Sequence, residues 1–262
     1  MTDHERQVDE LRPVAFAVAY RMLGTVSDAE DIVQETLLTL HRALADGEHI
    51  DSPRGFVATV TTRLSIDELR SARARREESV GQWLPEPIIT DSTGDPLQHA
   101  EMLDSLSLAM LALLESLSPE QRAVLLLRDV FDYAYDEIAA IVDKSEDNVR
   151  QLTARARRYV EQRRPRFQTT REQQEELADR FFAAAGQGDL AGLEALLAAD
   201  VKLTGDGGGK ATTPERPLRE RARVARTLTN WSGSLRQIPG LTLRRVEVNG
   251  SPACSRSTPI NG

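Results

Sequence analysis

Positive charge and base-reading side chains gather in one part of an acidic sequence. From Lys144 to Arg166 there are eight lysine or arginine residues against three acidic ones, although the formal net charge of the 262-residue chain is −8. The same stretch contains Asn148 and Gln151. Arginine pairs with guanine, and asparagine or glutamine with adenine, in the major groove of DNA. The chemistry indicated here is binding of a nucleic acid through local rather than overall charge.

Two short helices are predicted to position these side chains. The first is YDEIAAIV, starting at Tyr135, and the second follows a turn at Asp143 and Lys144 with Ser145 as its N-cap. In the second helix apolar residues recur at spacings of three and four, which favours one buried face. Two helices and a tight turn are typical of the helix-turn-helix. The pattern alone also fits a solvated basic face near a helix end.

Composition excludes several classes of protein. Hydrophobic residues make up 40% and charged residues 28%, and the one cysteine, Cys254, allows no intrachain disulfide or thiolate cluster. No apolar run approaches the ~18 residues of a membrane span, and the charged start MTDHERQVDELR does not resemble a secretory signal. We therefore expect a cytoplasmic protein with no membrane association, no metal and no cofactor.

Helical periodicity divides the chain into segments. Apolar residues recur at helical spacing before residue 77 and again from about 97 to 164, and the prolines and glycines of WLPEPIITDSTGDP indicate a linker between them. Ser27 and Ser118 are predicted N-caps, the first with Glu30 in a capping box. Two helices, a glycine turn and a strand ending at Asn249-Gly250 predict an α+β module after residue 170. The expected parts are a helical domain (8–77), a linker (78–98), a second helical domain (99–164), an α+β domain (171–250) and an unstructured tail (251–262).

Both helical segments resemble one protein family. LRPVAFAVAYRMLGTVSDAEDIVQETLLTLHRA and GFVATVTTRLSIDELRSARARRE are similar to region 2 of the extracytoplasmic-function (group 4) sigma factors, the promoter-recognition subunits of bacterial RNA polymerase. LESLSPEQRAVLLLRDVFDYAYDEIAAIVDKSEDNVRQLTARAR is similar to their region 4. Asp132 and Asp143 stand where relatives often carry glycine. The resemblance implies a mainly α fold of two sigma domains followed by the α+β module.

The resemblance also assigns roles to individual residues, and it implies no catalytic chemistry. Core polymerase, through its β′ and β subunits, and promoter DNA are the implied partners. The acidic segment DAEDIVQE would contact β′ through Asp28, Glu30, Asp31, Gln34 and Glu35. The −10 element would meet Arg54, Arg63, Arg70 and Arg73. The −35 element would meet Lys144, Ser145, Asn148, Arg150, Gln151 and Arg155.

The C-terminal module carries a narrower resemblance. WLPEP and DGGGK are similar to a motif pair of sigma factors with a SnoaL-like extension, a cone-shaped α+β fold that would act as a built-in regulator contacting the linker. After VEVNG no alternating apolar strand follows, so the module is expected to be truncated. All histidines and tyrosines precede residue 171, which disfavours catalysis there. The motif residues are Trp83, Leu84, Pro85, Glu86, Pro87, Asp206, Gly207, Gly208, Gly209 and Lys210.

Two other functions compete with the sigma factor. One is a stand-alone helix-turn-helix regulator whose C-terminal module binds a small molecule. Such a regulator has no need of the acidic DAEDIVQE segment, and it would more often dimerise on a palindrome. The other is a small-molecule isomerase, which the absence of histidine and tyrosine in the module disfavours. Binding of duplex DNA by the isolated chain would separate the sigma factor from the stand-alone regulator.

Overall fold

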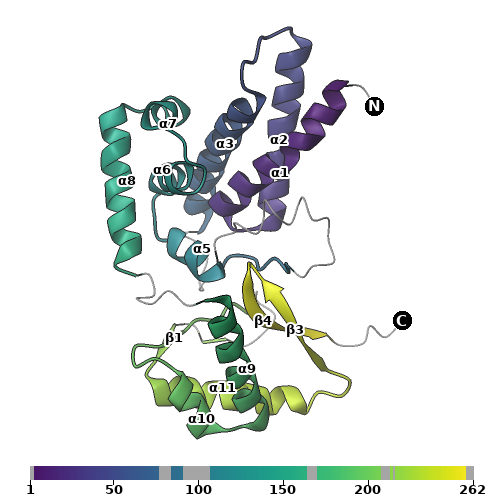
Figure 1. The fold of residues 1–262 in the computed structure, drawn as a ribbon, viewed down its shortest axis with the longest axis vertical. Coiled ribbons are helices and arrows are strands. Elements are labelled where there is room, and N and C mark those ends of the chain that lie inside the picture. Colours follow the sequence, from purple (N-terminus) through teal and green to yellow (C-terminus); the bar gives the residue numbers. More distant parts are fainter. Residues whose placement is uncertain are drawn as a thin grey trace. The chain divides into compact units, whose positions relative to one another are not determined.

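The computed structural model describes residues 3–76, 84–90, 107–163, 170–207, 213–214 and 216–257. They form two compact units (Figure 1). The first contains helices α1 to α3 and α5 to α8 together with residues 85–88. The second contains everything from α9 onward together with Leu84 and residues 89–90.

Three long helices open the first unit: α1 (Asp3–Leu23), α2 (Val26–Ala45) and α3 (Pro53–Arg76). Each of them packs against the other two. The sequence places the N-cap of α2 at Ser27, and this is wrong by two residues. Thr25 is the N-cap, its hydroxyl accepts a hydrogen bond from the backbone N–H of Asp28, and Val26 is already helical. Gly24 just before it has a positive φ of 78°, so the chain reverses there and α2 can start early.

Four shorter helices follow among the described residues of the first unit: α5 (Leu108–Leu114), α6 (Pro119–Asp129), α7 (Tyr135–Val142) and α8 (Glu146–Glu161). The predicted caps of α6 and α8 are confirmed. The Ser118 hydroxyl accepts from the N–H of Gln121, whose side chain accepts in return from the Ser118 N–H. The Ser145 hydroxyl accepts from the N–H of Asn148. The helix-turn-helix predicted from the sequence is therefore present as α7 and α8.

The turn between α7 and α8 relies on a strained residue. Asp143 lies in the left-handed region at φ 52° and ψ 56°, where side chains other than glycine are disfavoured. We expect Asp143→Gly to raise the free energy of unfolding by up to about 1 kcal/mol, because relief of the strain exceeds the added entropy of the unfolded chain. Urea denaturation would measure this. Asp136→Gly, within α7, is the control and should lower stability; a loss of stability in Asp143→Gly as well would contradict the expectation.

The two helical segments share one hydrophobic core. Its buried members come from α1, α2 and α3 and also from α5, α6 and α8. Arg122 on α6 is only 3% exposed, and its guanidinium donates to the carbonyls of Leu114 and of Met22 at the end of α1, and to the carboxylate of Glu115. A smaller cluster holds α7 and α8 to α6 through Val124, Leu127, Ile138, Ile141 and Val149. Segments 8–77 and 99–164 thus pack together within one unit.

The second unit is an α+β arrangement around a small core. Its helices are α9 (Arg171–Gln187), α10 (Leu190–Leu196) and α11 (Arg221–Arg236). Ala184, Ala185, Leu193 and Ala225 are buried where these helices meet. The short strands β1 (Lys202–Leu203) and β2 (Leu218–Arg219) pair antiparallel, as do β3 (Thr242–Val248) and β4 (Ser251–Ser257). The α+β character predicted for this part of the chain is present.

The hairpin between β3 and β4 gives one confirmation and one correction. Asn249 and Gly250 both have positive φ, 47° and 70°, as the predicted tight turn requires. The expectation of an unstructured tail from residue 251 is wrong for Ser251–Ser257, which pairs with β3 along its whole length. The sequence SPACSRS lacks alternating apolar residues, but an exposed strand can be held by its backbone hydrogen bonds. Residues 258–262 lie outside the described residues.

Candidate nucleic-acid and polymerase interfaces

One side of α8 presents three of the residues predicted to read DNA. Asn148, Gln151 and Arg155 are exposed and follow one another at spacings of three and four, which places them along one face of a helix. The opposite side is buried through Val149, Thr153, Ala156 and Val160. Arg158, which the sequence analysis left out, is also exposed and follows Gln151 by seven residues. The signal for it was available, since i+7 is the same face.

The other predicted −35 residues are placed differently. The Nε of Arg150 donates to Glu146 at 3.1 Å, and its guanidinium carbon lies 4.3 Å from the centroid of the Tyr135 ring. By helical periodicity Arg150 is about 160° around α8 from Asn148. The hydroxyl of Ser145 caps the helix, and Lys144 is half-buried. The structure therefore groups Asn148, Gln151 and Arg155, and sets Arg150 apart.

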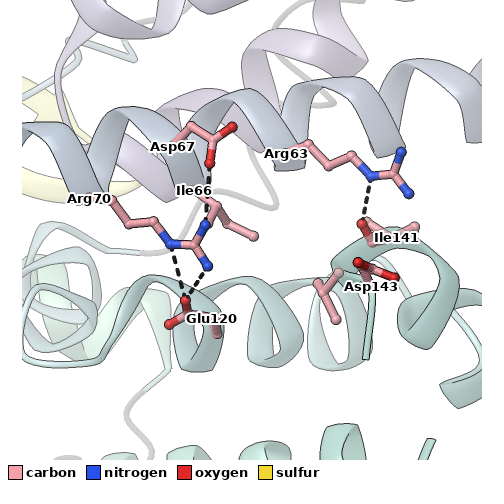
Figure 2. A pocket seen from close by; sticks show the side chains of 8 residues that line it. Arg63, Ile66, Asp67, Arg70, Glu120, Ile141 and Asp143 are labelled. Carbon is pink, nitrogen blue, oxygen red and sulfur yellow. Dashed lines mark hydrogen bonds and ion pairs between the residues drawn. The ribbon is translucent and has the colours of Figure 1, made fainter. Parts of the chain in front are cut away.

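The arginines predicted to meet the −10 element face another part of the first unit. Figure 2 shows Arg63 and Arg70 on α3 pointing toward α6 and α7. Arg63 donates to the backbone carbonyls of Ile141 at 2.9 Å and Ala140 at 2.8 Å. Arg70 forms an ion pair with Glu120 at 2.6 Å and a second with Asp67 at 3.3 Å. Arg54 is exposed, and the side chain of Arg73 lies outside the described residues.

A cavity of about 390 Å³ lies beside Arg63 and Arg70, and both basic and acidic side chains line it (Figure 2). Burial by itself would raise the pKa of Glu120, but hydrogen bonds from Arg70, from its own backbone N–H and from Ser118 outweigh this and lower its pKa below the ordinary value of about 4.5. The pKa of Arg70 is raised, first by the hydrogen bond to Glu120. The pair is thus fully ionised at neutral pH, and it links α3 to the start of α6.

A pH dependence of stability follows from the lowered pKa of Glu120. A carboxyl whose pKa is lower when folded stabilises the fold above its unfolded pKa and loses that contribution as the pH falls through the folded value. We expect the free energy of unfolding of the wild type to exceed that of Glu120→Gln by a constant amount near neutrality, and by less as the pH falls below about 4.5. Urea titrations of both proteins between pH 7 and pH 3 measure this; a pH-independent difference would contradict it.

The acidic residues predicted to bind polymerase lie along α2. Asp31, Gln34 and Glu35 are exposed, whereas Asp28 and Glu30 are half-buried, and Glu30 is paired with Arg12 of α1. Leu38 follows Asp31 by seven residues and remains 48% exposed. The sequence analysis did not single out Leu38.

The linker motif makes specific contacts within each unit. In the first unit the Tyr20 hydroxyl donates to the Glu86 carbonyl at 2.6 Å, and the Glu86 carboxylate accepts from the Val26 N–H at 2.8 Å. In the second unit the Leu84 N–H donates to the Asp206 carboxylate at 3.1 Å. Pro85, Pro87 and Gly207 are among the described residues. Trp83, Gly208, Gly209 and Lys210 lie outside the described residues.

The described part of the chain contains neither a cluster of metal ligands nor a helix that could span a membrane. Its histidine, cysteine, aspartate and glutamate side chains nowhere gather in a group of three or more that could hold a metal ion. Within the same residues no helix is both long and apolar enough to span a membrane.

Comparison with known proteins identifies both helical segments. Residues 7–75 match the family description "Sigma-70 region 2", and residues 107–160 match "Sigma-70, region 4". The chain is 40% identical over 223 residues to the ECF RNA polymerase sigma factor SigJ of Mycobacterium tuberculosis (strain ATCC 25618 / H37Rv), covering 84% of this chain and 70% of SigJ. It is 34% identical over 175 residues to the probable ECF RNA polymerase sigma factor SigI of Mycobacterium tuberculosis (strain CDC 1551 / Oshkosh), spanning 59% of that protein.

The likeness extends to three dimensions. The crystal structure of the Mycobacterium tuberculosis extracytoplasmic function sigma factor SigJ superposes with a TM-score of 0.73 at 34% identity. This match covers 95% of the present chain and 83% of that one, so it includes most of the C-terminal unit. Sequence, order of regions and fold agree, and the chain belongs to the extracytoplasmic-function RNA polymerase sigma factors.

Proposed function

We propose that this chain directs promoter-specific transcription initiation as the sigma subunit of RNA polymerase, without catalysing a reaction itself, and that its own C-terminal unit modulates this activity. The single observation that carries the proposal is that one chain has both an exposed acidic face on α2 and an exposed DNA-reading face on α8. A stand-alone regulator requires only the second. Binding to the polymerase β′ subunit is assigned to Asp31, Gln34, Glu35 and Leu38, and binding to the −35 element to Asn148, Gln151, Arg155 and Arg158.

Initiation requires the first unit to open. The numbers −10 and −35 are positions on the promoter, so the two elements lie about 25 base pairs apart. At about 3.4 Å per base pair this is roughly 85 Å. A compact body of this unit's length is about 40 Å across by the scaling of size with chain length. Segments packed on one core therefore cannot occupy both elements. In the closed form Arg63 and Arg70, assigned to the −10 element, are held by α7 and α6 instead of DNA.

Binding to core polymerase supplies the energy for opening. The closed form predominates only if it has a lower free energy than the open form. A ligand shifts the equilibrium between the two forms by the difference in its binding free energy for them. Contacts of α2 with β′, and of the region 4 helices with β, together span a distance that only the open form reaches. The isolated chain, with its net charge of −8, then binds promoter DNA weakly, and strongly only as part of the holoenzyme.

The C-terminal SnoaL-like unit modulates initiation through the linker. The hydrogen bond from the Leu84 N–H to Asp206 joins the WLPEP motif to the DGGGK motif. Two residues farther along the chain, Glu86 forms hydrogen bonds with Tyr20 near the end of α1 and with Val26 at the start of α2. A change at Asp206 is thus passed along a covalent segment of three residues. Asp206→Ala tests this: a changed yield of transcript with unchanged affinity for core polymerase supports modulation, and equal yields contradict it.

The experiment that tests the function is run-off transcription. The full chain is combined with core polymerase on a promoter selected by the holoenzyme, and electrophoretic mobility assays compare DNA binding with and without polymerase. Transcript and polymerase-dependent binding support the sigma function, which also places the protein with the chromosome in the cytoplasm. Tight specific binding by the isolated chain, with no initiation, would favour the stand-alone regulator.

A further inference from the structure

The C-terminal unit contains a basic stretch that the sigma function leaves unexplained. Between Arg216 and Arg245 the sequence has eight arginines and one acidic residue, Glu220, so this stretch contributes +7 to a chain whose net charge is −8. The segment around the recognition helix, Lys144 to Arg166, contributes +5. All eight cations are arginines, whose planar guanidinium groups bind phosphate with two parallel hydrogen bonds. An acidic chain thus concentrates positive charge in a second place.

Helix α11 displays part of this charge on one face. Its buried side, through Val224 and Ala225, packs onto the small core of the unit. Its opposite side presents Arg223 and Arg226, which are three residues apart and therefore neighbours on the helix surface. Thr227, Asn230 and Ser234 continue this face toward the C-terminal end with hydroxyl and amide groups, and α11 contains no acidic residue.

Five arginines of the stretch are exposed and have no carboxylate partner among the residues that the structure describes. Arg226 donates to the carbonyl of Ala222 in its own helix. By contrast, Arg236 donates to the Gly186 carbonyl, and Arg245 is paired with Asp179. Unpaired guanidinium groups next to one another repel, so their clustering is unfavourable unless an anion binds there. The five are Arg216, Arg219, Arg221, Arg223 and Arg226.

We propose that the face of α11 formed by Arg223 and Arg226 binds the phosphate backbone of duplex DNA next to the −35 element. The proposal rests on the sigma function, because region 4 brings the unit to the DNA. Helix α9 begins at Arg171 and α8 ends at Glu161, so the nine residues between them limit the separation of these helix ends to about 35 Å. Tethering over such a distance gives an effective concentration in the millimolar range. The exposed face of α11 carries charge and small polar groups. Such groups suit contacts to phosphate, which position a protein on DNA without reading its sequence.

Salt-dependent binding of the holoenzyme to promoter DNA tests the proposal. Core polymerase with the full-length chain is titrated against two fluorescent promoters, one with about 20 base pairs beyond the −35 element and one that ends at it. On the longer DNA we expect Arg223→Ala and Arg226→Ala each to lower the slope of log K against log salt by about 0.9, with roughly a two- to five-fold weaker affinity at moderate salt. On the shorter DNA neither variant should differ from the wild type.

A matched control separates this effect from a general change of charge. Arg180→Ala removes one exposed arginine from α9, outside the basic stretch, and should leave both slopes unchanged. Two results would overturn the proposal. One is that Arg223→Ala and Arg226→Ala give the same slope as Arg180→Ala, and the other is that they lose the same affinity on both DNAs. Weaker binding of these variants to core polymerase alone would also overturn it and indicate a protein partner. Failure of the wild type to initiate on either DNA would instead count against the sigma function.

Discussion

Linking α3 to α6 covalently is expected to abolish transcription initiation. In a Cys254→Ser background, which removes the exposed native cysteine, Arg70→Cys and Glu120→Cys introduce two thiols at the ends of the ion pair that joins these helices. A short bismaleimide can bridge them in the closed form. Because the compact unit is about half as wide as the distance between the promoter elements, the bridged protein cannot occupy both. Run-off transcript from the bridged holoenzyme should fall more than about tenfold.

The controls distinguish bridging from loss of the ion pair or from modification. Each single-cysteine variant treated with the same reagent, and the double variant before treatment, set the reference level, because Arg70→Cys by itself removes a side chain assigned to the −10 element; the fall on bridging is measured against that level. Loss of the Arg70–Glu120 pair itself should favour opening by no more than about 1 kcal/mol, since exposed pairs contribute little. If the bridged protein initiates as well as the unbridged one, the closed form is compatible with promoter binding and the opening step is wrong.

Substitution on the reading face of α8 has the second large expected effect. Arg155→Ala removes an exposed guanidinium that shares a helix face with Asn148 and Gln151. A paired contact with a base contributes about 1–3 kcal/mol of discrimination, so transcript from the cognate promoter should fall roughly 5- to 150-fold. Arg150→Ala, by contrast, removes a side chain held by Glu146 and Tyr135 on another side of the helix. We expect it to reduce transcription only a few fold.

The comparison of these two arginines uses promoters with single substitutions in the −35 element. Arg155→Ala should lose its preference at one base pair, while Arg150→Ala should keep the preferences of the wild type. Circular dichroism and the unfolding midpoint of each variant exclude loss of the fold. Equal losses for the two variants would show that the reading face extends around α8, and a greater loss for Arg150→Ala would reverse the assignment made from the geometry.

Much of the local structure was determined by the sequence alone. Ser118, Ser145 and the Asn249-Gly250 turn are short-range signals, in which side chain or backbone satisfies groups only a few residues away, and each prediction is confirmed. The same holds for the helix-turn-helix, because a buried stripe at spacings of three and four belongs to one helix. The order of the two sigma regions also identified the family, since motifs in sequence carry that information without any contact.

Long-range packing determined what the sequence could not indicate. Nothing near Arg63 or Arg70 in the sequence shows that their partners are the carbonyl of Ile141 and the carboxylate of Glu120, which lie 78 and 50 residues away. Strand β4 lacks an apolar pattern, and its pairing with β3 depends on backbone groups, so side-chain periodicity does not reveal it. Arg150 and Arg155 are equally basic in the sequence, and helical periodicity already puts them on different sides of α8, but only the fold brings the ring of Tyr135 against Arg150. Residue type and spacing determined the kind of chemistry, and tertiary contacts decided which charges remain available for it.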